Sequence, residues 1–397
     1  ESQAATRWLE IDRAAGGSPP SARDWYHRGN RLYRLRGADD QAHAAYAEAL
    51  KGAPSKAEAA QIRQARAELL FRQRKYEEAA VAFSALPQRA RTPVSRARSI
   101  ARTGRVKEAI DDLVELGRRK PARRSSYEAK YIAALLMLGE DREEEARELF
   151  AQVGAKAGAL RFKRGALWQL AWSDYRAGRY RDAIAGFEEL SRSQTFPIDT
   201  LRPRYWKARA LHRLDDPSAA HEFEAIASEF PLSYYGWQAA QRLTEMGRSV
   251  RPAPPRVPPA RTENLEERDF ERVRILIEGG LTAEAKKELE FISGRARRPG
   301  DWLRVAALFQ VLGEPHRTQR ESMRIGAEEL ARGPTRHSEE FWWHAWPRAF
   351  GPEVRAAAQE HHGAVDSDLI LAIIREESGY RPEAISAVGA RGLMQLM

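Results

Sequence analysis

Small and bulky apolar residues recur at helical spacing along most of the chain. An alanine is followed four positions later by a bulky apolar residue in the pairs Ala79 with Phe83, Ala109 with Leu113, Ala146 with Phe150, Ala183 with Phe187, and Ala219 with Phe223. Subtraction of the alanine numbers gives intervals of 30, 37, 37 and 36 residues. Residues four apart share one helix face, and a period in the thirties is typical of stacked helical hairpins. The pattern therefore predicts an all-α, TPR-like superhelical solenoid over residues 1–250.

Each hairpin of such a solenoid needs its neighbours, because one hairpin cannot bury its own apolar stripe. The small residue lets an adjacent helix approach, and the bulky residue fills the space beside it. Glycines that follow helical segments are predicted to take the left-handed conformation that ends a helix, at Gly104, Gly139 and Gly178. Three aromatic residues at helical spacing are expected to belong to the core: Trp168, Trp172 and Tyr175.

A proline-rich stretch interrupts the helical pattern. Residues 251–259 read RPAPPRVPP, with five prolines in eight positions, which predicts an extended connector over 251–263. Helical pattern resumes near Asn264, and Ala285 with Leu289 repeats the small–bulky pair. We therefore expect a helical linker domain over 264–350 and a further domain that begins within 351–397.

Composition narrows the class of protein only moderately. The chain has 397 residues, too many for one compact core. It has no cysteine, which excludes a disulfide framework or a thiol nucleophile. No apolar run approaches the roughly 20 residues that span a bilayer. The chain begins at Glu1 and ends at Met397 within a pattern, so we expect a fragment or a processed form.

The formal charge of +10, from 66 basic and 56 acidic residues, favours a polyanionic partner. Nucleic acid and a carboxylate-rich cell wall polymer both fit that description. The bases are interspersed with acids, and neither a zinc-finger spacing nor an RNP-like motif is present, so nucleic acid ranks last. The run Glu360-His361-His362 lacks the spacing that puts two imidazoles on one helix face, and we expect no metal site.

An aromatic segment, FWWHAWPRAF at 341–350, has two interpretations. Tryptophan faces pack against sugar rings, so the segment could be a glycan platform. Packing between the scaffold and the following domain is the favoured interpretation.

The last 33 residues carry the candidate chemistry. Asp366 or Ser367 can cap a helix whose predicted apolar stripe is Leu369, Ile370, Ile373 and Ile374. Glu377 follows the stripe in the last helical turn. Burial against apolar neighbours and the negative end of the helix dipole would both raise the pKa of its carboxyl, as a general acid near neutral pH requires. The residues alone do not decide between Glu377 and Glu376.

The positions after this helix suit close backbone approach and sugar contacts. Ser386 precedes the run Gly389-Ala390-Arg391-Gly392, and Leu393-Met394-Gln395-Leu396-Met397 follows it. Glycines allow another element or a ligand to approach closely. The Gln395 amide can both donate and accept a hydrogen bond, and methionines offer soft apolar contact.

These positions together resemble a known signature. Glu377-Ser378, then Ser386, then Gly389-Ala390-Arg391-Gly392-Leu393-Met394-Gln395 resemble the start of the transglycosylase SLT domain of soluble lytic transglycosylases, a goose-lysozyme-like fold. Upstream, Tyr205-Trp206 and Tyr234-Tyr235-Gly236 are similar to pieces of that family's U-shaped helical domain. The resemblance implies that 351–397 is the N-terminal part of a lysozyme-like catalytic domain.

The resemblance also implies a reaction. Glu377 would be the single acid/base that cleaves the β-1,4 bond between N-acetylmuramic acid and N-acetylglucosamine, with formation of a 1,6-anhydromuramoyl end. The implied substrate-binding residues are Ser378, Ser386, Met394, Gln395 and Met397. The resemblance implies no cofactor, a periplasmic location in a Gram-negative bacterium, peptidoglycan as substrate, and cell wall synthases or hydrolases as further partners.

Three rival hypotheses stay open. The chain could be an interaction scaffold with a degenerate catalytic remnant, a hydrolase of the goose-lysozyme type, or a nucleic-acid-binding protein. Most glycosidases need a second carboxylate. After Glu377 the only further acid is Glu383, in a proline-containing turn, and we expect it to be surface.

Overall fold

The protein is described from a computed structural model. The structure describes residues 20–35, 37–52, 54–87, 92–119, 124–155, 160–250, 263–334, 339–360, 365–386 and 389–397. Two compact units, Glu1–Ser193 and Gln194–Met397, divide the chain. The predicted connector lies outside the described residues except for Glu263, and the predicted boundaries at 250 and 350 stay predictions.

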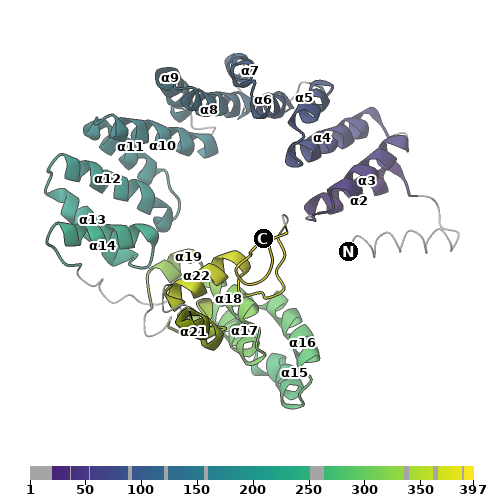
Figure 1. Ribbon diagram of the computed structural model, residues 1–397, viewed down its shortest axis with the longest axis vertical. Helices are drawn as coiled ribbons and strands as arrows, with labels where there is room; N and C mark the ends of the chain where they lie inside the picture. Colours follow the sequence, from purple (N-terminus) through teal and green to yellow (C-terminus); the bar gives the residue numbers. More distant parts are fainter. Residues whose placement is uncertain are drawn as a thin grey trace. The chain divides into compact units, whose positions relative to one another are not determined.

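The first unit consists of antiparallel helical hairpins that follow one another along the chain (Figure 1). Its helices are α2 (Ala22–Arg34), α3 (Asp39–Lys51), α4 (Lys56–Arg72), α5 (Tyr76–Ser84), α6 (Thr92–Arg102), α7 (Val106–Arg118), α8 (Arg124–Gly139), α9 (Glu143–Gly154), α10 (Leu160–Arg176) and α11 (Tyr180–Arg192). The all-α, TPR-like fold predicted from the sequence is confirmed.

The small–bulky pairs form the core of the hairpins, as predicted. In the first unit the alanines are fully buried and their partners are at most 1% exposed: Ala79 with Phe83, Ala109 with Leu113, Ala146 with Phe150, and Ala183 with Phe187. In the second unit Ala219 with Phe223 and Ala285 with Leu289 are buried to the same extent. The pairs lie on the second helix of each hairpin, so one helix face determines how successive hairpins stack.

The hairpin turns each contain a residue in the left-handed conformation, although this residue is not always a glycine. Gly104 and Gly178 have φ of 91° and 76°, as predicted. The prediction for Gly139 is wrong, because α8 continues through it and Asp141 takes the left-handed conformation with φ 57°. The Arg142 amide then donates to the Met137 carbonyl at 2.9 Å and closes the turn. Aspartate tolerates this conformation better than most residues with a side chain.

The aromatic residues of α10 are half-buried rather than fully buried. The rings of Trp168 and Trp172 stack at 5.9 Å, and those of Trp172 and Tyr175 stack at 5.6 Å. Trp168 also contacts the buried ring of Phe187 at 5.6 Å. The expectation of core packing thus holds in part: the three rings pack against one another and Trp168 packs against the core, but each ring stays partly exposed.

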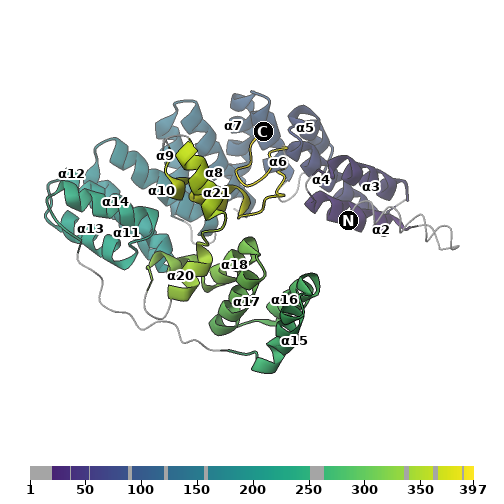
Figure 2. The same ribbon diagram turned by 60° about the horizontal axis from the view of Figure 1, so that its bottom comes forward.

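The second unit is also helical and holds the C-terminal segment. Hairpins α15–α16 and α17–α18 lie side by side in both views (Figures 1 and 2). The helices of this unit are η2 (Pro197–Thr200), α12 (Leu201–Arg213), α13 (Ser218–Glu229), α14 (Tyr234–Glu245), α15 (Glu267–Glu278), α16 (Thr282–Arg295), α17 (Pro299–Val311), α18 (Pro315–Ser322), η3 (Met323–Ile325), α19 (Ala327–Ala331), α20 (Glu339–Ala345), α21 (Gly351–Glu360) and α22 (Ser367–Ser378).

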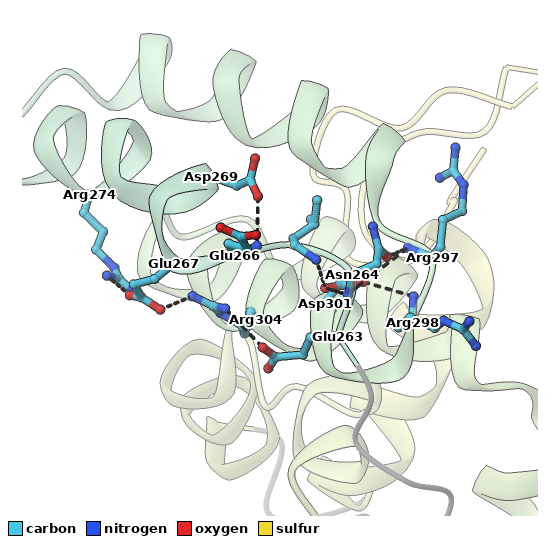
Figure 3. A network of polar contacts seen from close by, with 11 residues as sticks. Glu263, Asn264, Glu266, Glu267, Asp269, Arg274, Arg297, Arg298, Asp301 and Arg304 are labelled. Atoms are coloured by element: carbon cyan, nitrogen blue, oxygen red, sulfur yellow. Dashed lines mark hydrogen bonds and ion pairs between the residues drawn. The ribbon is translucent and has the colours of Figure 1, made fainter.

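A buried carboxylate fixes the point where the described chain resumes after the connector. Asp301 is 0% exposed, and its oxygens accept hydrogen bonds from the backbone amides of Asn264 (3.0 Å), Leu265 (3.0 Å), Arg297 (3.4 Å) and Arg298 (3.1 Å), as Figure 3 shows. Arg298 is the N-cap of α17 and Asp301 is its N3 residue, so this bond satisfies the N-cap amide. Asp301 therefore holds the segment before α15 against the turn between α16 and α17.

A second long-range contact joins α19 to the turn between α13 and α14. The Leu232 amide donates to the Ala331 carbonyl at 3.1 Å. The Arg332 side chain is 9% exposed and pairs with Glu229 at 3.5 Å. Its guanidinium lies 4.3 Å from the ring centre of Phe230. Within the second unit, residues before position 250 and after position 263 are thus held together.

The aromatic segment packs mainly within the second unit. Trp342 and Trp346 stack at 4.0 Å, and the guanidinium of Arg375 on α22 lies 5.2 Å from the Trp346 ring centre. These contacts support the packing interpretation for both residues. Trp343, in contrast, is 64% exposed.

Candidate functional site

The helix that carries the candidate acid is defined at both ends. The Asp366 carboxylate accepts from the amides of Asp368 (2.7 Å) and Leu369 (3.3 Å), so Asp366 rather than Ser367 is the cap. At the other end Gly379 adopts the left-handed conformation with φ 57°, and its amide donates to the Arg375 carbonyl. The helix therefore ends directly after the Glu377-Ser378 pair.

The buried face of α22 differs from the predicted stripe. Leu371, Ile374 and Ser378 are buried, at positions i, i+3 and i+7. Leu371 and Ile374 pack with Val354 of α21 and with Tyr380. Leu369, predicted to belong to the stripe, is 54% exposed, because it lies roughly half a turn around the helix from this face.

Adjacent glutamates at the end of α22 face different surroundings. The prediction that Glu377 is buried against apolar neighbours is wrong, since the structure shows it exposed. At about 100° per residue, Glu377 projects from the flank of the buried face, while Glu376 projects from the opposite side. Glu376 pairs with Arg375 at 2.8 Å. Glu377 makes no ion pair with any residue that the structure describes.

Ser378 and Met394 serve the local core in this structure. Ser378 is 2% exposed, and its hydroxyl donates to the Ile374 carbonyl at 3.0 Å. Met394 and Leu393 pack against the apolar cluster of α21 and α22. Of the predicted substrate-binding residues, Met397 is the most exposed, at 91%.

A compact loop follows the helix, and Gln395 holds it together. Its amide nitrogen donates to the carbonyls of Ala384 (3.1 Å) and Gly392 (2.9 Å). The Gly392 amide donates to the same Ala384 carbonyl at 2.9 Å. Gly392 and Gly389 have φ of 76° and 94°, a conformation that favours glycine. The glycines of the signature thus close this loop, and the amide donors of Gln395 serve it as well.

Ser386 lies at the base of the same loop. Its amide donates to the Ala390 carbonyl at 2.8 Å, and its hydroxyl oxygen accepts from the Ala390 amide at 3.0 Å. Isolated bridges pair Ile385 with Arg391 and Arg391 with Leu396. Ser386, Gln395 and Met397 are therefore brought onto one loop directly after the helix that carries Glu377. Their contacts with a ligand stay predictions.

Two residues of the site are not found by sequence reasoning. Tyr380 is 3% exposed, and burial raises the pKa of its hydroxyl. The Arg381 side chain donates to the Ser378 carbonyl at 3.0 Å and so covers the helix end. The signal for Tyr380 was an aromatic residue directly after a helix-ending glycine.

The described residues form neither a candidate metal site nor a candidate membrane span. No group of three or more histidine, cysteine, aspartate and glutamate side chains could hold a metal ion there. Among the same residues, no helix is both long enough and apolar enough to cross a membrane.

A known protein family matches the part of the chain that holds this site. Residues 355–397 match the family described as Transglycosylase SLT domain. No curated protein sequence matches the chain. The lytic transglycosylase Slt of Pseudomonas aeruginosa, solved as an inactive mutant, is similar in structure, with a TM-score of 0.53 and 18% identity. That match covers 98% of this chain and 64% of the other, so the chain spans less than two thirds of that relative.

A second solved structure shows a weaker likeness. The 70 kDa soluble lytic transglycosylase of Escherichia coli matches with a TM-score of 0.44 and 16% identity, over 100% of this chain and 67% of the other. Sequence identities this low show a shared fold alone. The shared fold is inferred here from the Pseudomonas aeruginosa structure, whose TM-score is the higher of the two. The chain is thus a series of helical hairpins followed by helix α22, which carries an exposed glutamate in its last turn and is followed by a hydrogen-bonded loop. The chain carries transglycosylase SLT domain sequence at its C-terminal end.

Proposed function

We propose that this chain belongs to a lytic transglycosylase that cleaves the glycan strands of peptidoglycan. One observation carries the proposal: Glu377 is exposed at the end of α22, next to the buried Ser378, within the segment that matches the SLT domain. The adjacent Glu376 is paired with Arg375 and projects the other way. In this proposal Glu377, rather than Glu376, is the carboxyl that acts on the sugar.

The proposed reaction uses this one carboxyl twice. Protonated Glu377 gives its proton to the glycosidic oxygen between N-acetylmuramic acid and N-acetylglucosamine as the bond to C1 breaks. The muramoyl C6 hydroxyl then attacks C1, and the Glu377 carboxylate takes the hydroxyl proton. The glycosidic bond is replaced by an internal 1,6-anhydro bond, no water is consumed, and Glu377 regains its initial protonation state.

The proposed mechanism uses one acid. Retaining and inverting glycosidases usually place a second carboxylate about 5–10 Å from the first. Among described residues after Glu377 the only acid is Glu383, which is exposed and lies in the turn after Arg381. In this proposal the loop residues Ser386, Gln395 and Met397 line the sugar subsites, with Ser378 and Met394 supporting them from the core.

The wider proposal follows from the substrate. Peptidoglycan lies in the periplasm of Gram-negative bacteria, so we place the protein there. Wall synthases and hydrolases, which share this substrate, are the proposed partners. The reaction described above requires no cofactor.

The test is mass spectrometry of the muropeptides that the full-length protein releases from purified sacculi. The wild type should release 1,6-anhydromuropeptides and Glu377→Gln should release none, because glutamine keeps the shape and lacks the proton. Glu376→Gln is the matched control and should resemble the wild type. Reducing ends would show a hydrolase instead. Equal release by Glu377→Gln, or none by any form, would refute the assignment.

A further inference from the structure

The face formed by α12 and α14 in the second unit carries exposed aromatic rings. Tyr234, Trp237 and Gln241 follow one another at i, i+3 and i+7 on α14. Tyr234 is 67% exposed and Trp237 is 53% exposed, and Gln241 is exposed as well. Large aromatic residues at such exposure, grouped on one helix face, are typical of an interaction surface.

The adjacent helix α12 is strongly basic. The α12 sequence, LRPRYWKARALHR, contains five arginine and lysine residues and no acid. Arg204 and Lys207 pair with acids of α13, at 3.0 Å and 2.7 Å. Arg209 is half-buried and makes no ion pair with any described residue. Its guanidinium lies 5.7 Å from the Trp206 ring centre.

A buried hydroxyl joins the two helices and orients this charge. Tyr205 is 3% exposed, and its hydroxyl oxygen accepts from Arg209 at 3.4 Å and from Arg242 of α14 at 3.5 Å. The same hydroxyl donates to the Gln238 side chain at 3.5 Å. Arg242 is already paired with Glu245 at 2.7 Å. Arg209 is thus held in place by a tyrosine and a tryptophan while its charge stays uncompensated by a carboxylate.

We infer that this face, with Arg209, Trp237, Tyr234 and the side-chain amides of α14, binds a carboxylate-bearing glycan strand apart from the site at Glu377. Aromatic faces pack on sugar rings, amides bond to sugar hydroxyl and acetamido groups, and arginine pairs with carboxylates through two parallel hydrogen bonds. The choice of a peptidoglycan strand as the acidic glycan rests on the proposed function. The requirement for a carboxylate on the ligand rests on the structure alone, because Arg209 has no carboxylate partner among the described residues.

The test measures binding without turnover, by isothermal titration calorimetry of the Glu377→Gln protein. The probes are the disaccharide tetrapeptide of N-acetylglucosamine and N-acetylmuramic acid, which is acidic, and the neutral tetramer of N-acetylglucosamine. The acidic probe should bind more tightly, and Arg209→Gln should weaken it about tenfold, the size of one charge-assisted hydrogen bond. Trp237→Ala should weaken both probes.

Arg213→Gln is the matched control, because Arg213 is an exposed arginine one turn further along α12. It should bind like the parent. Circular dichroism checks folding, and Trp237→Ala serves as second variant if Arg209→Gln unfolds. Unchanged binding in both variants, equal affinity for both probes, or no binding at all would overturn the inference. Binding that depends on Arg209, without anhydro products from the wild type, would refute the proposed function alone.

Discussion

Asp301→Ala should destabilise the second unit more than any exposed capping substitution. The side chain is 0% exposed and accepts from four backbone amides. In Asp301→Ala these donors have no acceptor in a site closed to solvent. Each donor that stays unpaired lowers the free energy of unfolding by about 1–3 kcal/mol. Partial relaxation and the sharing of two oxygens among four donors bring the expected loss to about 3–5 kcal/mol of the free energy of unfolding.

Asp301→Asn should cost about 2 kcal/mol, because one oxygen is kept while the new amide group faces backbone donors. The assay combines urea unfolding with hydrogen exchange at the amides of Asn264, Leu265, Arg297 and Arg298, which should exchange faster in both variants. Glu58→Ala is the matched control, since Glu58 holds the same capping-box position in α4 but is exposed. A shift in the urea midpoint for Asp301→Ala no larger than that for Glu58→Ala would refute the reasoning.

Two further predictions concern packing and protonation. Gly236→Ala should destabilise the second unit by about 2–3 kcal/mol in urea unfolding, because a Cβ would lie 1.8 Å from the Phe230 carbonyl oxygen. Gly294→Ala, in open space on α16, should be neutral or stabilising; equal effects would contradict the steric account. Burial lowers the pKa of His344 and of His316. As pH falls through about 6.5, these two histidines are therefore protonated more fully in the unfolded chain than in the folded chain, which lowers the free energy of unfolding. The thermal midpoint should therefore fall between about pH 7.5 and 5.5, less so in His344→Gln, and a flat wild-type profile would contradict this sign.

The sequence by itself determined the repeat and its core. The small–bulky pairs needed only the i, i+4 geometry of one helix to be found, and each of them is buried. The same local reasoning placed Glu377 in the last turn of a helix that ends at Gly379. The turn at Gly139 failed, because the choice between a glycine and a nearby aspartate for the left-handed residue depends on where the helix stops.

The tertiary structure decided which residues meet across the chain. Asp301 contacts amides some 37 positions away, and Leu232 contacts Ala331 across the connector. Such contacts carry no period, so no local pattern predicts them. For the same reason the sequence by itself predicted an apolar environment for Glu377, which is exposed in the structure. The packing of α21 on α22 buries Leu371 and Ile374 and leaves Glu377 exposed. The Gln395 side chain donates to the Ala384 carbonyl and closes the loop that follows.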